Sequence, residues 1–299
     1  MRALVTGANG FVGRHLCGHL RTSGDEVLGV DRECDVTNVA SVERAFNDFQ
    51  PDSIYHLAAL SHIGESWKNP AEYVRVNVLG TRNVFEVARR VVPNASIVFI
   101  STADVYGIVT ESELPLRETH RTVPVNPYSQ SKLEAELLVK NIVRESDQRV
   151  LIVRPFNHVG PGQSPKFVVP ALVSRLLDAR ESGAASIPVG DLSTRRDFCD
   201  VRDVVRSYRL LMRYGKSGEA YNVASGFATA LSDIASDLVA LIAPDVVLAP
   251  DAELFRPSEV PVTRGSFEKI HDATGWEPTI PLATSLSDVV TDMRLSRSQ

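Results

Sequence analysis

VTGANGFVG, residues 5–13, is the stretch of sequence that decides the fold. Its glycines Gly7, Gly10 and Gly13 allow a tight turn, a close approach of the backbone to a pyrophosphate, and close packing of the next helix on the preceding strand. The N-terminus of that helix then faces the phosphates. A glycine pattern alone also fits an ordinary strand-to-helix turn, so its surroundings decide its meaning.

The sequence on either side of the turn supports a dinucleotide-binding unit. Residues 2–6 form an apolar strand, and residues 11–20 repeat apolar side chains at helical spacing. A second predicted strand, residues 26–30, leads into Asp31, about twenty residues after the last glycine. A carboxylate there accepts hydrogen bonds from the adenine-ribose hydroxyls. We therefore predict that the chain binds a dinucleotide.

The choice between NAD and NADP stays open. Asp31 would repel a 2′-phosphate and so favours NAD, whereas the neighbouring Arg32 can clamp that phosphate and so favours NADP. Arg32 can equally be a solvated surface charge. We expect one of these two cofactors without a preference between them.

Charge and hydropathy exclude two classes of partner. The 299 residues carry a net charge of −5 with both signs scattered, so no nucleic-acid partner is expected. No apolar stretch is long enough to cross a bilayer, and the N-terminus is already the first core strand rather than a secretory signal. The expected location is the cytoplasm, with no membrane partner.

The cysteines and histidines do not suggest a metal site. Cys17, Cys34 and Cys199 are too few and too far apart for a disulfide framework or a zinc site. The histidines are dispersed and lack supporting carboxylates, so no bound catalytic metal is expected.

Apolar strands and helices alternate along the first half of the chain. Further strands are predicted at residues 53–58, 96–102 and 149–154. Near-continuous apolar strands separated by helices are typical of a parallel sheet covered on both faces, with ligands at the carboxyl ends of the strands. We predict an α/β fold built on a doubly wound, Rossmann-type parallel sheet.

The second half of the chain differs in composition from the first, because loops rich in proline and glycine begin after residue 154. Helices are predicted at residues 168–180, 231–242, 267–274 and 282–293. We assign residues 1–160 to the dinucleotide-binding domain and residues 161–299 to a smaller C-terminal substrate-binding α/β lobe. The segment at about 196–226 contains the strand-like AYNVASG and is expected to return to the main sheet.

Residues suited to proton transfer follow two of these elements. SIVFISTADVYG, residues 96–107, places Thr102 and Asp104 just beyond a strand end. PYSQSK places Tyr128 and Lys132 four residues apart, on one face of a helix that runs to about residue 142. A lysine ammonium beneath a tyrosine phenol is expected to lower the pKa of the phenol, so that it exchanges a proton with a carbinol or a ketone.

VTGANGFVG, HLAA, STADVYG, PYSQSK and RPFNHVGPGQ together resemble the extended short-chain dehydrogenase/reductase family over essentially the whole chain. The resemblance implies an NAD(P)-dependent oxidoreductase with Thr102, Tyr128 and Lys132 as its catalytic set. It also implies a homodimer, because the helices at 71–89 and 128–142 correspond to those that pair in family dimers. The cofactor-binding residues that we assign are Gly7, Asn9, Gly10, Phe11, Val12, Gly13, Asp31, Arg32, Asp35, Val36, Leu57, Ala58, Ala59, Tyr128, Lys132 and Pro155.

The second half narrows the resemblance to the branch that acts on GDP-linked sugars. FNHVGPGQ, RRDFCDVRDVV and LFRPSEVPVTRGSFEKIHDATGWEP carry this part of it. By resemblance, Asn157, Arg196 and Arg256 contact the nucleotide and its pyrophosphate, Val168 lies in the substrate site, and Glu259 lies near the nucleoside. Arginine forks suit phosphate oxygens, whereas Glu259 can equally be a surface carboxylate. The expected partner is a GDP-linked 4-keto-6-deoxy sugar.

Asp104 separates the activities within this branch. A 4,6-dehydratase needs a base for the C5 proton and an acid for the C6 hydroxyl, which the resemblance assigns to a glutamate in a T-S-E or T-D-E pattern. Here the run is Thr102-Ala103-Asp104, whose carboxylate reaches one methylene less far. We therefore expect reduction of the C4 ketone of GDP-4-dehydro-6-deoxy-D-mannose to GDP-6-deoxy-D-mannose (GDP-D-rhamnose), with Asp104 in the catalytic site as a turn carboxylate or a contact to a substrate hydroxyl.

Several alternatives stay open. The chain can be a GDP-mannose 4,6-dehydratase, a nucleotide-sugar C4 epimerase, or a dinucleotide-binding protein without catalysis. A reductase can also give the 6-deoxytalose epimer, since turning the sugar over requires no change in the catalytic set. Asp35 can accept a hydrogen bond from the adenine amino group or simply form a turn.

Overall fold

The chain is described here by a computed structural model that covers residues 1–255 and 260–298. Its central sheet has six parallel strands in the order β10-β5-β4-β3-β1-β2, which confirms the predicted Rossmann-type fold. The order reverses between β1 and β3, the place where doubly wound sheets bind ligands. The strands are β1 (Arg2–Thr6), β2 (Glu26–Val30), β3 (Ser53–His56), β4 (Ser96–Ile100), β5 (Val150–Pro155) and β10 (Ala220–Val223).

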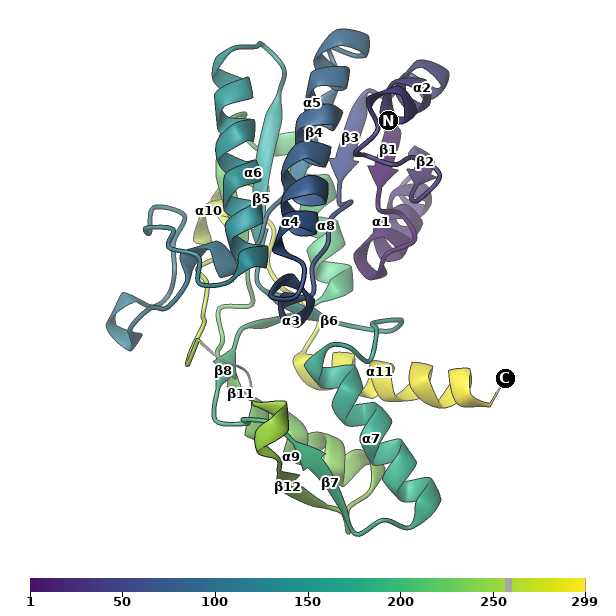
Figure 1. Cartoon of the computed structure of the whole chain (residues 1–299), viewed down its shortest axis with the longest axis vertical. Helices are drawn as coiled ribbons and strands as arrows, with labels where there is room; N and C mark the ends of the chain where they lie inside the picture. Colours follow the sequence, from purple (N-terminus) through teal and green to yellow (C-terminus); the bar gives the residue numbers. More distant parts are fainter. Residues whose placement is uncertain (256–259, 299) are drawn as a thin grey trace.

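Helices cover both faces of this sheet, as Figure 1 shows with α5 and α6 in front and α8 behind. One face packs against α1 (Phe11–Thr22), α8 (Val201–Tyr214) and α10 (Glu268–Thr274). The other packs against α2 (Val39–Phe49), α5 (Gly80–Val91) and α6 (Pro127–Arg144). Among the described residues, no helix combines the length and the hydropathy needed to span a bilayer.

Both faces of the strands are apolar because both are buried. Along β4, Val98 faces the cluster of α1 and α8, while Ile97 and Phe99 face the cluster of α2, α5 and α6. Phe46 of α2 and Phe85 of α5 are fully buried on the second face, and each such side chain contributes about 2 kcal/mol through removal from water. The sheet is therefore a rigid base for the loops at its carboxyl edge.

A smaller lobe lies beyond that edge, in the lower part of Figure 1. Its core joins α7 (Val168–Ser182), α9 (Leu231–Ile242) and α11 (Leu282–Arg297) with the parallel pair β7 (Ser186–Val189) and β12 (Val247–Pro250). The helices predicted from residues 168, 231 and 282 begin at those residues, and α11 runs four residues beyond the predicted end at 293.

Shorter elements connect the sheet to this lobe and carry much of the candidate site. Two short pairs, β6 (Asn157–Val159) with β9 (Phe198–Asp200) and β8 (Arg195–Arg196) with β11 (Thr229–Ala230), bridge the two parts. The remaining short helices are α3 (Ile63–Ser66), α4 (Pro70–Tyr73), η1 (Val74–Leu79), η2 (Ala103–Tyr106), η3 (Glu111–Glu113) and η4 (Ala252–Leu254).

The segment predicted as a helix at residues 71–89 is helical throughout, but it contains a π-helical stretch that was not predicted. The chain forms α4, then the π-helix η1, and only then the regular helix α5. Asn77 explains the wider turn, because its buried side-chain amide bonds both backbone groups of Leu60 at 2.8 and 3.0 Å and the hydroxyl of Ser131 at 2.9 Å. Such insertions widen a helix locally and are frequent near functional sites.

Candidate active site

The turn between β1 and α1 accepts only glycine at two positions. Gly7 has a φ of +70°, and a Cβ there would lie 2.9 Å from the backbone nitrogen of Ala58. A Cβ on Gly13 would overlap the carbonyl oxygen of Gly7. The backbone of the loop after β3 therefore lies directly against the turn, and the exposed N-terminus of α1 starts at Gly10 with a cradle that fits a pyrophosphate.

The end of β2 is tied to this turn. Asp31 accepts a hydrogen bond from the backbone N–H of Asn9 over 2.9 Å, and Arg32 beside it is exposed. Asp35 accepts the N–H and the hydroxyl of Thr37 at 2.9 and 2.8 Å, so it forms a turn, and an adenine contact stays a prediction. Asn9 and Asp31 thus lie together at the carboxyl ends of β1 and β2.

A chain of hydrogen bonds that the sequence did not predict holds the backbone N–H of Ala58. The N–H of Ala58 donates to Thr6 Oγ1 at 3.1 Å, and Thr6 lies 2.8 Å from Nδ1 of His56, its partner in the β1–β3 register. Nε2 of His56 lies 3.0 Å from Thr81 Oγ1, which in turn donates to the carbonyl of Asn77 at 2.6 Å. Burial lowers the pKa of His56 to about 3, so the ring is neutral.

Thr102, Asp104 and Tyr128 meet beyond the end of β4. Thr102 is the N-cap of η2, and its Oγ1 accepts the N–H of Asp104 at 3.2 Å. Helix α6 begins at Pro127 behind its own N-cap, Asn126, which accepts the N–H of Ser129 at 2.8 Å. This start brings Tyr128 within hydrogen-bonding reach of the Thr102 side chain.

The pKa of the Tyr128 phenol is raised, which contradicts the expectation that Lys132 lowers it. Burial is the largest cause and the nearby Asp104 carboxylate adds to the rise, while the hydrogen bond from Thr102 acts in the opposite direction. Tyr128 therefore holds its proton at neutral pH. A group in this state is an acid, ready to give a proton to an oxygen that becomes negative.

Lys132 lies one helical turn further along α6 in apolar surroundings. Its side chain is almost fully buried, with Nζ 4.7 Å from the centre of the Phe99 ring. Burial lowers the pKa of Lys132 to about 7, and the negative charge of Glu136 opposes that fall. Lys132 is therefore only partly protonated near neutral pH, and a neighbouring charged group can favour or disfavour its charged form.

The predicted substrate residues lie at the junction with the smaller lobe. Asn157 is exposed on β6, and Val168 is the first residue of α7. Arg196 on β8 donates to the carbonyls of Arg195 and Pro261 at 3.0 and 3.4 Å. Pro155, assigned to the cofactor, ends β5. Arg256 and Glu259 lie outside the described residues.

The glycine turn is followed by an aromatic contact to β6, one of the strands that join the sheet to the smaller lobe. Phe11, assigned to the cofactor, stacks on His158 of β6 with the ring centroids 6.0 Å apart. The loop that follows β6 is held by α1, because Arg14 donates to the carbonyls of Asn9 and Gly162 at 2.7 and 3.0 Å. The start of α1 therefore relates the dinucleotide turn to the lobe that is expected to hold the substrate.

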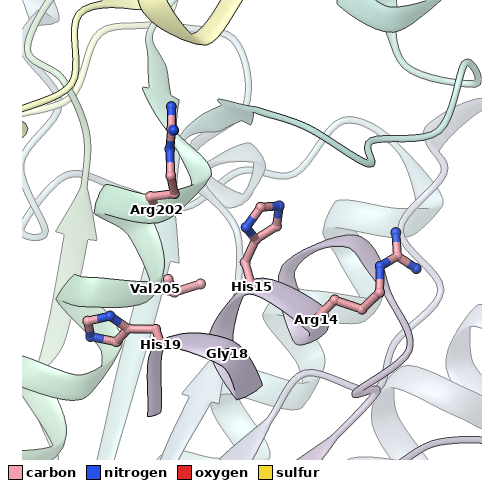
Figure 2. Close-up of a pocket in the computed structure, with 6 residues that line it drawn as sticks. All are labelled: Arg14, His15, Gly18, His19, Arg202 and Val205. Carbon is pink, nitrogen blue, oxygen red and sulfur yellow. The ribbon is translucent and has the colours of Figure 1, made fainter. Parts of the chain in front are cut away.

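A groove of about 510 Å³ lies on the outer surface of α1 and α8 (Figure 2). Its lining is Arg14, His15, Gly18, His19, Arg202 and Val205, and none of these six belongs to the predicted site. The basic side chains bond protein groups: His15 contacts the carbonyl of Pro161 at 2.9 Å, and Arg202 pairs with Asp200 and Asp288. In the described part of the chain, no three His, Cys, Asp or Glu side chains are grouped so as to hold a metal.

Residues 3–224 match the NAD dependent epimerase/dehydratase family, and the chain belongs to that family. It is accordingly an NAD(P)-dependent oxidoreductase of the extended short-chain dehydrogenase/reductase type, as the motifs predicted.

Two curated relatives act on GDP-linked sugars by name. The chain is 34% identical to GDP-6-deoxy-D-mannose reductase of Pseudomonas aeruginosa over 97% of this chain and 96% of that protein. It is 32% identical to GDP-6-deoxy-D-talose 4-dehydrogenase of Aggregatibacter actinomycetemcomitans over 92% of each. A solved structure described as RMD from Pseudomonas aeruginosa complexed with NADPH matches with a TM-score of 0.91 and 33% identity, over 99% of this chain and 100% of that one.

Proposed function

We propose that the protein reduces the C4 ketone of GDP-4-dehydro-6-deoxy-D-mannose to GDP-6-deoxy-D-mannose, with NADPH or NADH as the reductant. The observation that carries the proposal is the placement of the Tyr128 phenol within hydrogen-bonding reach of Thr102, beside Asp104 and one helical turn from Lys132. The likeness to the reductase of Pseudomonas aeruginosa and to the NADPH complex supports the substrate and the cofactor.

In this proposal each catalytic residue has one task. When bound, the reduced nicotinamide supplies the hydride. Tyr128 donates its proton to the C4 oxygen, and the Thr102 hydroxyl donates a hydrogen bond to the same oxygen as it gains charge. Lys132 favours the phenolate that Tyr128 becomes after the transfer, because a positive neighbour stabilises the charged form.

The two other enzymatic candidates differ in their first step. A 4,6-dehydratase and a C4 epimerase both begin by oxidising C4, a step in which Tyr128 must accept a proton instead of giving one. A dehydratase also needs a side chain that reaches C5 and C6, and Asp104 is one methylene shorter than the glutamate expected there. The relative named for GDP-6-deoxy-D-talose favours one variation of the proposal, in which the same catalytic residues give a product with the opposite configuration at C4.

The remaining assignments belong to this proposal as well. We propose that residues 1–160 bind the dinucleotide and that residues 161–299 bind the sugar nucleotide, with about 196–226 completing the main sheet. Asn157, Val168 and Arg196 would contact the GDP moiety, and the same role is proposed for Arg256 and Glu259. The enzyme is proposed to work in the cytoplasm.

We further propose a homodimer formed by the helices that cover one face of the sheet. Val74 and Leu79 of η1 and Leu137 of α6 are large apolar side chains that are 40%, 46% and 52% exposed. These elements pack against each other, so the three side chains extend one helical layer that a second copy can cover. Sedimentation should give twice the chain mass, and Leu137→Glu should give the monomer.

The function is tested by mixing the purified protein with GDP-4-dehydro-6-deoxy-D-mannose and either NADPH or NADH. Oxidation of one cofactor per sugar reduced supports the reductase, and NMR of the product gives the C4 configuration. Conversion of GDP-mannose to its 4-keto-6-deoxy form without added cofactor would instead identify a dehydratase. Tyr128→Phe should lower kcat by roughly a hundredfold or more while the Kd of the cofactor changes little.

A further inference from the structure

Glu136 is a fully buried carboxylate on α6, one helical turn beyond Lys132. Its Oε2 accepts the hydroxyl of Ser101 at 3.0 Å and Nε of Arg154 at 3.1 Å. Its Oε1 pairs with the other end of the Arg154 guanidinium and with Nζ of Lys140 at 2.9 Å. The carboxylate is therefore the point where three elements of the structure meet.

Two of the partners of Glu136 are next to a residue of the candidate site. Ser101 follows β4 and precedes Thr102, and Arg154 precedes Pro155 at the end of β5. The N–H of Ser101 also donates to the carbonyl of Val153 at 2.7 Å, so the two strand ends are locked together. A shift of this carboxylate would move both strand ends relative to α6.

The network continues to the helix that carries Asp104. Arg154 donates to the hydroxyl of Tyr106 in η2 at 3.0 Å and lies over the Tyr106 ring, 5.1 Å from its centre. The Tyr106 hydroxyl donates to Oδ1 of Asn222 in β10 at 2.7 Å. The loop between Thr102 and Tyr106 is thus fixed at both ends by one buried network.

We propose that Glu136 is a positioning residue for the catalytic set: its carboxylate holds the ends of β4 and β5 against α6, so that Thr102, Tyr128 and Lys132 keep one geometry. Stability alone does not account for such a group, because a buried ion pair is often no better than well-packed apolar side chains. Catalysis does depend on it, since a displacement of about 1 Å can cost on the order of a hundredfold in rate. The catalytic part of this inference rests on the proposed reductase function.

The test compares Glu136→Gln with Asp25→Asn. Asp25 is also buried and also pairs with an arginine, Arg209, at 2.8 Å, but it joins α8 to the start of β2 and touches no site residue. Both variants should lose thermal stability, by roughly 10 °C. Only Glu136→Gln should lower kcat, by about ten- to a hundredfold, with the KM of cofactor and sugar changed less than about threefold.

A milder variant covers the case in which Glu136→Gln does not fold. Ser101→Ala removes one hydrogen bond to the carboxylate and leaves the Arg154 pair intact. It should lower kcat by about threefold to tenfold, again without a matching change in KM. If every folded variant of Glu136 and Ser101 keeps kcat within about twofold of the wild type, the positioning role is wrong.

A second readout does not need turnover. Lys132 interacts electrostatically with Glu136 of its own helix and with the neutral His56 of β3, and Tyr128 lies one helical turn before it on α6. The chain has six lysines, so the 13Cε resonance of Lys132 can be followed with pH in lysine-labelled protein. Glu136→Gln should move its titration to lower pH and Asp25→Asn should not, because only the first removes a negative neighbour.

The two readouts separate the inference from the proposed function. If the wild-type protein does not reduce the GDP-linked ketone, the proposed function is wrong, and the Lys132 titration then tests whether the Glu136 carboxylate acts on the catalytic set. An unchanged titration in folded Glu136→Gln would overturn that role.

Discussion

The carboxylate of Asp31 accepts a hydrogen bond from the backbone N–H of Asn9 over 2.9 Å, which joins the end of β2 to the glycine turn. This side chain shapes the turn, and we predict that it also sets the charge that the adenosine ribose meets. Arg32, the next residue, is exposed and offers the opposite charge. We therefore propose that the choice between NADH and NADPH depends on these two neighbours.

Asp31→Asn should shift that choice toward NADPH. The amide oxygen of asparagine can still accept the N–H of Asn9, so the turn is kept, while the charge that repels a 2′-phosphate is lost. We expect the ratio of Kd for NADH to Kd for NADPH to rise by roughly tenfold, measured by fluorescence titration. Arg32→Ala should change the ratio in the other direction, and equal effects on both cofactors would contradict the assignment.

Asp104→Asn tests why Tyr128 is protonated. The Asp104 carboxylate raises the pKa of Tyr128, so its removal should lower that pKa and leave burial as the main cause of the rise. Tyr128 acts as an acid in the proposed reduction, and activity is lost as pH rises through its pKa. The alkaline limb of kcat against pH should therefore move to lower pH in the variant. A limb that stays in place would mean that Asp104 does not act on Tyr128.

Two glycines of α1 offer a matched pair of substitutions. Gly13→Ala should cost about 2 kcal/mol or more of unfolding free energy and weaken dinucleotide binding, because the new Cβ overlaps the Gly7 carbonyl. Gly18→Ala lies in the same helix with nothing within 4 Å of the added carbon, and should stabilise the protein by about 0.5–1 kcal/mol. Urea unfolding with and without cofactor measures both. Similar losses in the two variants would show that the turn tolerates a side chain.

Sequence patterns predicted those structural features that are determined by neighbouring residues. The strand positions, the glycine turn, and the i, i+4 placement of Tyr128 and Lys132 each depend on a few neighbouring residues, and the fold followed from the alternation of strands and helices. The strands predicted at 53–58 and 96–102 end two residues earlier, at His56 and Ile100. Helix α8 was not predicted, although apolar residues such as Val204 and Leu211 recur at helical spacing between charged residues such as Arg202.

The rest depends on contacts between residues far apart in the sequence. The π-helix forms because the Asn77 side chain reaches Leu60 and Ser131, and no pattern within residues 71–89 contains that information. The sign of the Tyr128 pKa shift was wrong for the same reason, since it depends on burial and on where Asp104 comes to lie. A spacing of four residues shows that two groups share a helix face, but it does not give the polarity of what covers them.

His56 makes the stability of the dinucleotide loop sensitive to acid. Because Thr81 Oγ1 donates to the carbonyl of Asn77, it accepts a hydrogen bond from Nε2 of His56, which leaves Nδ1 as the acceptor for Thr6. A proton on Nδ1 would reverse that last bond, so that the ring donates to Thr6 Oγ1, and it would place a buried positive charge beside the hydroxyl that holds the N–H of Ala58. The loop that contains Ala58 is therefore stabilised by the neutral form of His56.

The pKa of His56 falls from an ordinary 6.5 to about 3, so between these pH values the unfolded chain binds the proton and the folded protein does not. Stability from this residue is complete above pH 6.5 and is lost as pH falls toward 3, by up to about 1.4 kcal/mol per pH unit. His56→Gln, whose amide can bond both threonines without titrating, should flatten this slope in urea unfolding measured from pH 6.5 to 4. A variant as acid-sensitive as the wild type would show that other groups take up the proton.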